Sequence, residues 1–130
     1  MGAGKTAVDN HKALCGAVKT LGEELSLRVY TKFKAGQTIW GTKRKIDVVL
    51  SNTDGTKKLG VSCFSQDGSG TAYIKFFGKL DDTKKYPIRG IIVYSGPGFK
   101  DKFRGIMNNY GAIPFEDLDK WARTFFNISR

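Results

Sequence analysis

The sequence predicts one α/β domain in which helices cover a mixed central sheet. A stretch with helical apolar spacing opens the chain, three strand-like runs follow, and a strand–helix–strand succession occupies residues 58–94. Strands joined by a tight turn run antiparallel, whereas strands joined through a helix run parallel by a right-handed crossover. A chain of 130 residues is long enough for one hydrophobic core, so we expect a single domain over 1–130.

The first predicted helix covers about 7–25. Its apolar residues recur at intervals of three and four and would share one helix face: Leu14, Ala17, Val18, Leu21 and Leu25. Glycine lowers helix propensity, so Gly16 and Gly22 weaken the pattern, and Gly22 is where a break would fall.

Three strands are predicted from the alternation of side chains between two faces. Residues 27–34 alternate between largely apolar and largely basic side chains, and residues 44–50 alternate before becoming fully apolar. Residues 58–65 place Leu59, Val61 and Cys63 on one face and Gly60, Ser62 and Phe64 on the other. The hairpin turn between the second and third strands is predicted at 52–55, because Asp54-Gly55 suits a tight turn.

The second half of the chain predicts two further helices around a buried strand. A helix capped by Ser69 or Thr71 would run to about 85, with Ile74, Phe77 and Leu80 as its core stripe. The apolar run in 89–94 suits a central strand buried on both faces. A short helix over 100–108 and a last helix after Pro114 complete the order. The elements therefore predict a sandwich of the three-layer type, in the order helix, three strands, helix, strand, helix.

The charge balance points to a polyanionic partner. Lys and Arg number 22 against 12 Asp and Glu, a formal net charge of +10, which does not suit a protein specialised for cationic partners. No apolar run is long enough to span a membrane, and the first twenty residues lack the pattern of a secretory signal. We therefore expect a cytoplasmic protein, in the host cytoplasm if it is viral.

Few residues suit nucleotide, metal or nucleophile chemistry. Gly2-Ala3-Gly4-Lys5-Thr6 resembles the end of a phosphate-binding loop, but no strand and no earlier glycine precede it. His11, the only histidine, is expected to face solvent on the first helix. Cys15 and Cys63 lie in apolar sequence and lack the spacing of a zinc site or a disulfide framework, so two buried free thiols are expected.

The densest charge lies in residues 28–58, with eight basic residues against two acidic ones. A solvated edge strand would also carry lysines, which discourage pairing with other sheets. We favour phosphate contacts, because the charge of the whole chain agrees and aromatic residues are interleaved. The candidate nucleic-acid contacts are Arg28, Lys32, Lys34, Trp40, Lys43, Arg44 and Lys45.

Residues 41–50, the hairpin and residues 59–66 resemble the core of the restriction-endonuclease-like PD-(D/E)XK superfamily, over about 20–95. The resemblance implies that Asp47 binds Mg²⁺, and that Glu24 or Glu23 on the first helix joins it. It places the acidic–any–lysine triplet of active members at Ser62-Cys63-Phe64, with Gln66 as a glutamine often found just after it, here a candidate nucleic-acid contact. The resemblance also implies dimers, because members commonly act in pairs.

The triplet departs from the family at both functional positions. A serine hydroxyl is a poor Mg²⁺ ligand compared with a carboxylate, and phenylalanine cannot orient the attacking water as lysine would. The favoured function is therefore DNA or RNA binding by a nuclease fold with an impaired centre and weak Mg²⁺ binding. One alternative is a Mg²⁺-dependent endonuclease using Asp47, Glu24 and a migrated Lys75. Another is a structural or assembly protein of a virus particle, such as a phage.

Overall fold

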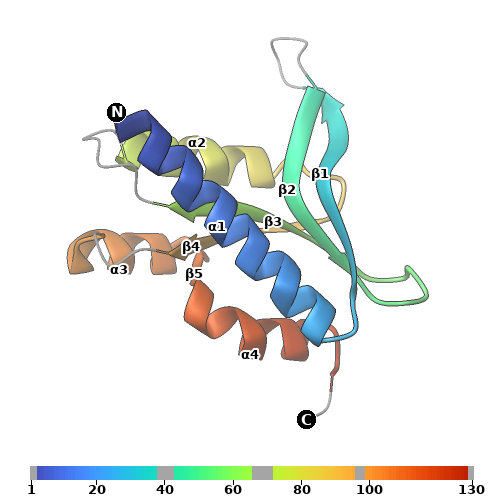
Figure 1. Cartoon of the computed structure of the whole chain (residues 1–130). Helices are drawn as coiled ribbons and strands as arrows, with labels where there is room; N and C mark the ends of the chain where they lie inside the picture. Colours follow the sequence, from blue (N-terminus) through green and yellow to red (C-terminus); the bar gives the residue numbers. More distant parts are fainter. Residues whose placement is uncertain (1–2, 38–42, 66–71, 96–98, 129–130) are drawn as a thin grey trace.

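The structure, a computed structural model, describes residues 3–37, 43–65, 72–95 and 99–128 (Figure 1). The predicted element order is confirmed, with one short strand added near the C-terminus. The elements are α1 (Ala3–Glu24), β1 (Arg28–Gln37), β2 (Lys43–Ser51), β3 (Lys58–Ser65), α2 (Ala72–Thr83), β4 (Arg89–Ser95), α3 (Asp101–Asn109), β5 (Ile113–Pro114) and α4 (Phe115–Phe125). In the described ranges, no helix is long and apolar enough to cross a bilayer.

The sheet is mixed, as the sequence predicts. Its strands lie in the order β1-β2-β3-β4-β5, with β1 at one edge. The pairs β1–β2 and β2–β3 are antiparallel, and β3–β4 is parallel through the α2 crossover. The unpredicted β5 pairs with β4 in parallel. It is only two residues long, and a strand of this length leaves no periodic pattern in the sequence.

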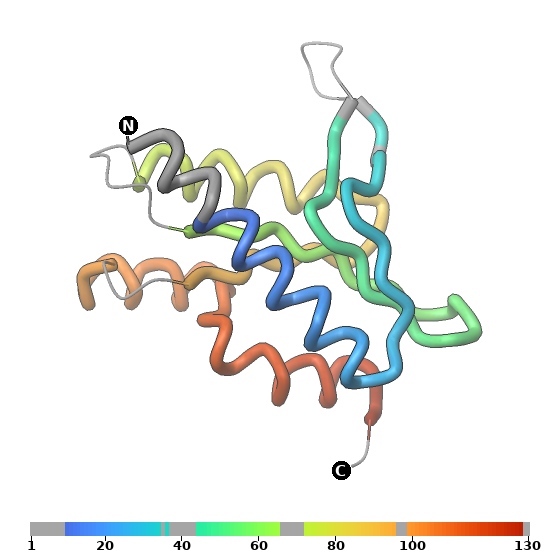
Figure 2. Tube along the Cα trace, viewed as in Figure 1, coloured from blue at the N-terminus to red at the C-terminus, as the bar shows by residue number. Residues whose placement is uncertain are grey.

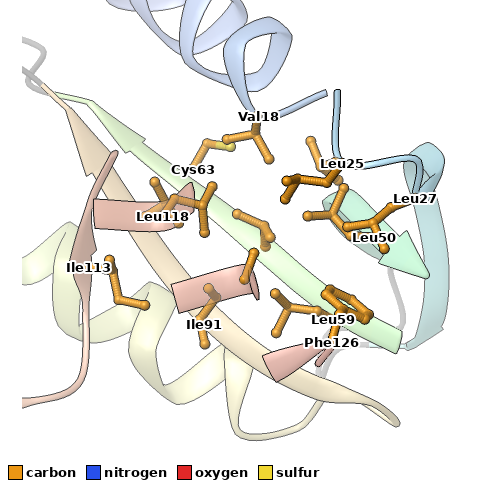
Figure 3. Packing of buried hydrophobic residues seen from close by; sticks show 14 of the residues in the cluster. Val18, Leu25, Leu27, Leu50, Leu59, Cys63, Ile91, Ile113, Leu118 and Phe126 are labelled. Atoms are coloured by element: carbon orange, nitrogen blue, oxygen red, sulfur yellow. The ribbon is translucent and has the colours of Figure 1, made fainter. Parts of the chain in front are cut away.

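Helices cover both faces of this sheet. On one face, α1 and α4 bury residues such as Val18 and Leu118 against Leu50, Leu59 and Ile91 (Figure 3). On the other face, α2 and α3 pack over an aromatic cluster centred on β3 and β4. The trace in Figure 2 shows β1 and β2 rising together away from the remaining strands at one end. The three-layer prediction is therefore confirmed. The diverging ends of β1 and β2 are the region in which we expect a functional site.

The predicted core stripe of α2 is correct for Leu80 but wrong for Ile74 and Phe77, because the helix is rotated. Ile74 is 75% exposed and Phe77 is 39% exposed, whereas Phe76 is fully buried. Phe76 contacts the ring of Phe64 on β3, and this aromatic packing fixes which helix face turns inward. The stripe that packs on the sheet side is Ala72, Phe76, Leu80 and Thr83.

Gly22 does not break α1, which continues to Glu24. A Cβ atom at Gly22 would lie 2.6 Å from Cδ2 of Leu50 and 2.9 Å from Cγ2 of Val29. These distances are shorter than van der Waals contact. The glycine therefore lets α1 approach the β1–β2 hairpin closely.

Candidate functional site

Asp47 lies where β2 separates from β3. The β2–β3 ladder runs from Ser51↔Lys58 to Val48↔Val61, and Asp47 is the next residue of β2 beyond it. The carboxylate Oδ2 of Asp47 accepts a hydrogen bond of 2.9 Å from the backbone N–H of Cys63. If the ladder continued, the N–H of Cys63 would donate to a backbone carbonyl of β2; here the Asp47 side chain accepts that hydrogen bond instead. The contact fixes the position of the carboxylate.

His11 does not simply face solvent, contrary to the prediction. Its Nε2 lies 3.3 Å from Oδ2 of Asp47 and 3.7 Å from Sγ of Cys15. Cys15 follows His11 by one helical turn, so both side chains project from α1 over the gap between β2 and β3. The His11 side chain is 39% exposed and that of Asp47 is 25% exposed. Sequence reasoning missed this group because it sought cysteines near each other, and not a His–Cys pair spaced four residues apart.

The contacts within this group shift its pKa values. The hydrogen bond to Asp47, followed by that to Cys15, raises the pKa of His11 to about 10. Burial pushes the pKa of Asp47 upward, but the hydrogen bonds from His11 and the Cys63 N–H, with the charge of Lys79, leave it below its usual value. A hydrogen bond from the Cys63 thiol lowers the pKa of Cys15 to about 6, and the same interaction with burial raises the pKa of Cys63.

These shifts predict a pH dependence for His11 in chelator-treated protein. The folded pKa of His11, about 10, exceeds the ordinary 6.5, so its stabilising effect is complete below pH 6.5 and is lost as pH rises through 10. Asp47, with a lowered pKa, contributes above its usual 3.8 and loses that contribution as pH falls. NMR of the single histidine should show imidazolium persisting above pH 8. Asp47→Asn should move the titration toward the ordinary value, and a wild-type midpoint near 6.5 would contradict the assignment.

A cleft of about 500 Å³ opens beside Asp47 on the α2 side of the sheet. Basic residues from two elements line it: Lys45 from β2, and Lys75 and Lys79 from α2. The structure therefore brings Lys75 into the same cleft as Asp47, as the migrated-lysine alternative requires. The remaining lining residues are Asp47, Ser62, Gly78, Asp82 and Tyr86. We call this the basic cleft.

The two family positions on β3 occupy different environments. Ser62 lines the basic cleft and shares a hydrogen bond with Tyr86, whose pKa burial raises to about 12. Phe64, 3% exposed, lies instead in the aromatic cluster with Phe76, Phe99 and Phe103. The position to which the resemblance assigns the lysine of active members is therefore part of the hydrophobic core.

Arg44 is not exposed for phosphate contact, contrary to the expectation from the basic run. Its side chain is 9% exposed, and its Nε donates a hydrogen bond of 2.6 Å to Oδ1 of Asp82 on α2. The neighbouring Lys45 is exposed and lines the basic cleft, to which the Arg44 partner Asp82 also belongs. A run of basic residues in the sequence does not reveal which of them is buried in an ion pair.

Lys34 and Lys45 are direct partners across the β1–β2 ladder, and both are exposed. Like charges directly opposite in a ladder destabilise it. Arg28 and Lys32 on β1 are also exposed, but Arg28 lies near the far end, opposite Ser51. The side chain of Lys43, and Trp40 and Gln66 entirely, lie outside the part that the structure describes.

Glu24 is not brought to Asp47. It is exposed at the end of α1, thirteen residues beyond His11. At a rise of about 1.5 Å per residue, this separation is roughly 20 Å along the helix. Glu23 lies in the same last turn, so neither carboxylate reaches the site that His11 marks.

The residues of the basic cleft do not fit a Mg²⁺ site. Mg²⁺ needs oxygen ligands in near-octahedral geometry, usually from carboxylates and waters. Of the residues described here, the carboxylates that line the cleft are Asp47, which His11 and Cys63 engage, and Asp82, which pairs with Arg44. The described cleft residues therefore offer Mg²⁺ too few oxygen ligands, so the donor set disagrees with the metal of the superfamily.

Comparison with known proteins gives the family. The sequence matches the family described as "PD-(D/E)XK nuclease superfamily domain" over residues 4–119. The chain therefore belongs to the PD-(D/E)XK nuclease superfamily, and the predicted resemblance is confirmed. No curated protein matches the sequence.

One solved structure supports the fold. It is titled "Crystal Structure of Protein of Unknown Function AF1548" and superposes with a TM-score of 0.51 at 15% sequence identity. The match covers 77% of this chain and 54% of that chain, so the present chain spans about half the length of this neighbour. At this identity the likeness concerns the fold alone.

Proposed function

We propose that this protein binds nucleic acid through the basic cleft and the adjoining β1–β2 hairpin, and that its nuclease centre is impaired. The single observation that carries the proposal is the replacement of acidic by basic chemistry around Asp47. Lys45, Lys75 and Lys79 line the cleft where the superfamily gathers carboxylates. A cleft of this kind attracts phosphate.

The Lys34–Lys45 pair supports a polyanionic ligand. The register places Lys34 opposite Lys45, so their like charges repel, and a phosphate bound by both would relieve that repulsion. Because Lys45 belongs both to this pair and to the cleft, one sugar–phosphate backbone can contact the hairpin and α2 together. Contacts of this type neutralise phosphates without reading base sequence.

The proposal predicts salt-dependent binding that three substitutions weaken. Lys45→Ala, Lys75→Ala and Lys79→Ala combined should lower the affinity for all duplex sequences similarly. Each lost phosphate contact should reduce the slope of log affinity against log salt by about 0.9. Fluorescence anisotropy with labelled duplex and single-stranded oligonucleotides, across a salt series, measures both quantities.

A matched control removes the same charge elsewhere. Lys19, Lys58 and Lys120 are exposed on α1, β3 and α4, outside the basic cleft. Their combined replacement by alanine should change the salt slope less than the cleft variant does. Equal effects of the two variants, or wild-type binding that ignores salt, would contradict a defined phosphate-binding cleft.

Cleavage is the competing activity, and the shared cleft of Asp47 and Lys75 is the observation in its favour. We propose that hydrolysis is absent or weak, because Ser62 supplies no carboxylate and the lysine position is occupied by Phe64. Supercoiled plasmid incubated with Mg²⁺ or Mn²⁺ should remain uncut by the isolated chain. Metal-dependent cutting that Asp47→Ala abolishes would establish the migrated-ligand endonuclease instead.

A further inference from the structure

The group formed by His11, Cys15 and Asp47 combines three types of ligand atom. An imidazole nitrogen, a sulfur and a carboxylate oxygen lie within 4.8 Å of one another. They come from one turn of α1 and from β2, which the fold holds in contact. We propose that these three residues form a binding site for a borderline-soft divalent cation, with Zn²⁺ as the best match, separate in chemistry from the Mg²⁺ of the superfamily.

Two of the three spacings among the ligand atoms match a tetrahedral ion, and all three lie within 4.8 Å. Zinc ligand bonds of about 2.0–2.2 Å to nitrogen and oxygen and about 2.3 Å to sulfur give tetrahedral edges of about 3.4 Å for N–O and about 3.6 Å for N–S. The structure has 3.3 Å between Nε2 of His11 and Oδ2 of Asp47, and 3.7 Å between that Nε2 and Sγ of Cys15. The hydrogen bond between His11 and Asp47 is therefore longer than the usual charge-assisted N–H···O⁻ bond of about 2.7–2.9 Å. The group is therefore open enough to hold an ion between its members.

Charge and donor softness favour the same class of ion. With the thiolate of Cys15 and the carboxylate of Asp47, the site carries two negative charges, which balance a dication. Thiolate and imidazole suit zinc, whereas Mg²⁺ prefers oxygen alone.

A hydrogen bond orients one of the proposed ligands. The backbone N–H of Cys63 donates to Oδ2 of Asp47 and fixes its position. Partners of this kind fix ligand orientation and strengthen metal sites. Because the His11 and Asp47 side chains are 39% and 25% exposed, an ion can enter from solvent, and water can complete its coordination.

Cobalt spectroscopy tests the site without nucleic acid, so the outcome is independent of the proposed function. Co²⁺ added to the chelator-treated chain should produce a thiolate-to-cobalt charge-transfer band, and Zn²⁺ should abolish it in equimolar amounts. Millimolar Mg²⁺ should not. Cys15→Ser should lose the band, and His11→Gln and Asp47→Asn should each weaken Zn²⁺ binding at least tenfold. The control Asp81→Asn, which removes an exposed carboxylate on α2, should bind as the wild type does.

Metal-free melting curves of each variant distinguish lost ligands from lost folding. A variant that melts cooperatively but does not bind supports the site. A wild-type chain without the cobalt band would overturn the proposal and leave a hydrogen-bonded His–Cys–Asp group. A band that survives in Cys15→Ser would also overturn it, because another thiolate would then be the ligand.

Discussion

Phe64→Lys is expected to unfold the protein and not to restore cleavage. The substitution recreates the lysine of the family triplet, but the side chain is 3% exposed. Its ring lies 5.4 Å from that of Phe99, 5.9 Å from Phe76 and 6.4 Å from Phe103, measured between centroids. Removing a buried phenylalanine costs about 3–5 kcal/mol, and an unpaired ammonium adds more. Small domains have only about 5–15 kcal/mol of stability, so the variant should lose most or all of it.

Urea denaturation and thermal melting measure this effect. Phe33→Lys makes the same chemical change at a phenylalanine that is 37% exposed on β1, and it should cost far less. Ser62→Glu with Phe64→Lys, the full family triplet, should be as unstable as Phe64→Lys alone and should cut no plasmid. A double variant that melts near the wild type and cleaves DNA with Mg²⁺ would show that the core accommodates the lysine.

Asp82→Ala is expected to destabilise the protein by about 1.5–3 kcal/mol, the range for a hydrogen bond to a charged group. It leaves the guanidinium of Arg44, 9% exposed, without its carboxylate partner. Arg44→Met should cost less than Asp82→Ala, because it removes the buried charge and not its partner. The free energy of unfolding in urea gives this order directly.

The neighbouring residue gives the matched comparison. Arg44 and Lys45 carry the same charge on adjacent positions of β2, but Lys45 is exposed and lines the basic cleft. Lys45→Met should therefore weaken nucleic-acid binding with little change in stability. Arg44→Met should lower stability while a folded fraction keeps its affinity. The reverse pattern would mean that Arg44 leaves Asp82 to contact phosphate.

The fold could be predicted from the sequence because its elements are long and strongly patterned. The alternation in β3 correctly separated Cys63 from Ser62 and Phe64, and the buried run of β4 correctly predicted a central strand. The stripe of α2 was wrong because Ile74 and Phe77 have the right spacing, and only the aromatic cluster decides in favour of Phe76. Tertiary packing outweighs periodicity there.

The sequence predicts the residues that neighbouring strands bring to the candidate site, but not those that α1 brings. Asp47 and Ser62 were placed by the hairpin, and the structure sets both beside one cleft. His11 and Cys15 reach Asp47 because α1 crosses the sheet at a particular angle, which Gly22 permits and no local pattern encodes. Glu24 was misplaced for the same reason, since its distance from Asp47 depends on where along α1 the crossing occurs.

Because Phe64 is buried, a lysine cannot be introduced at position 64 without further substitutions. A mutation back to lysine would meet a cluster in which Phe76, Phe99 and Phe103 already fill the space. Those neighbours would have to change as well, and each such change alone would leave a void that destabilises the core. Ser62 is only 4% exposed but lines the cleft, so a longer side chain there has open space beside it. The two positions therefore differ: a carboxylate at position 62 needs no change in the aromatic cluster, whereas a lysine at position 64 does.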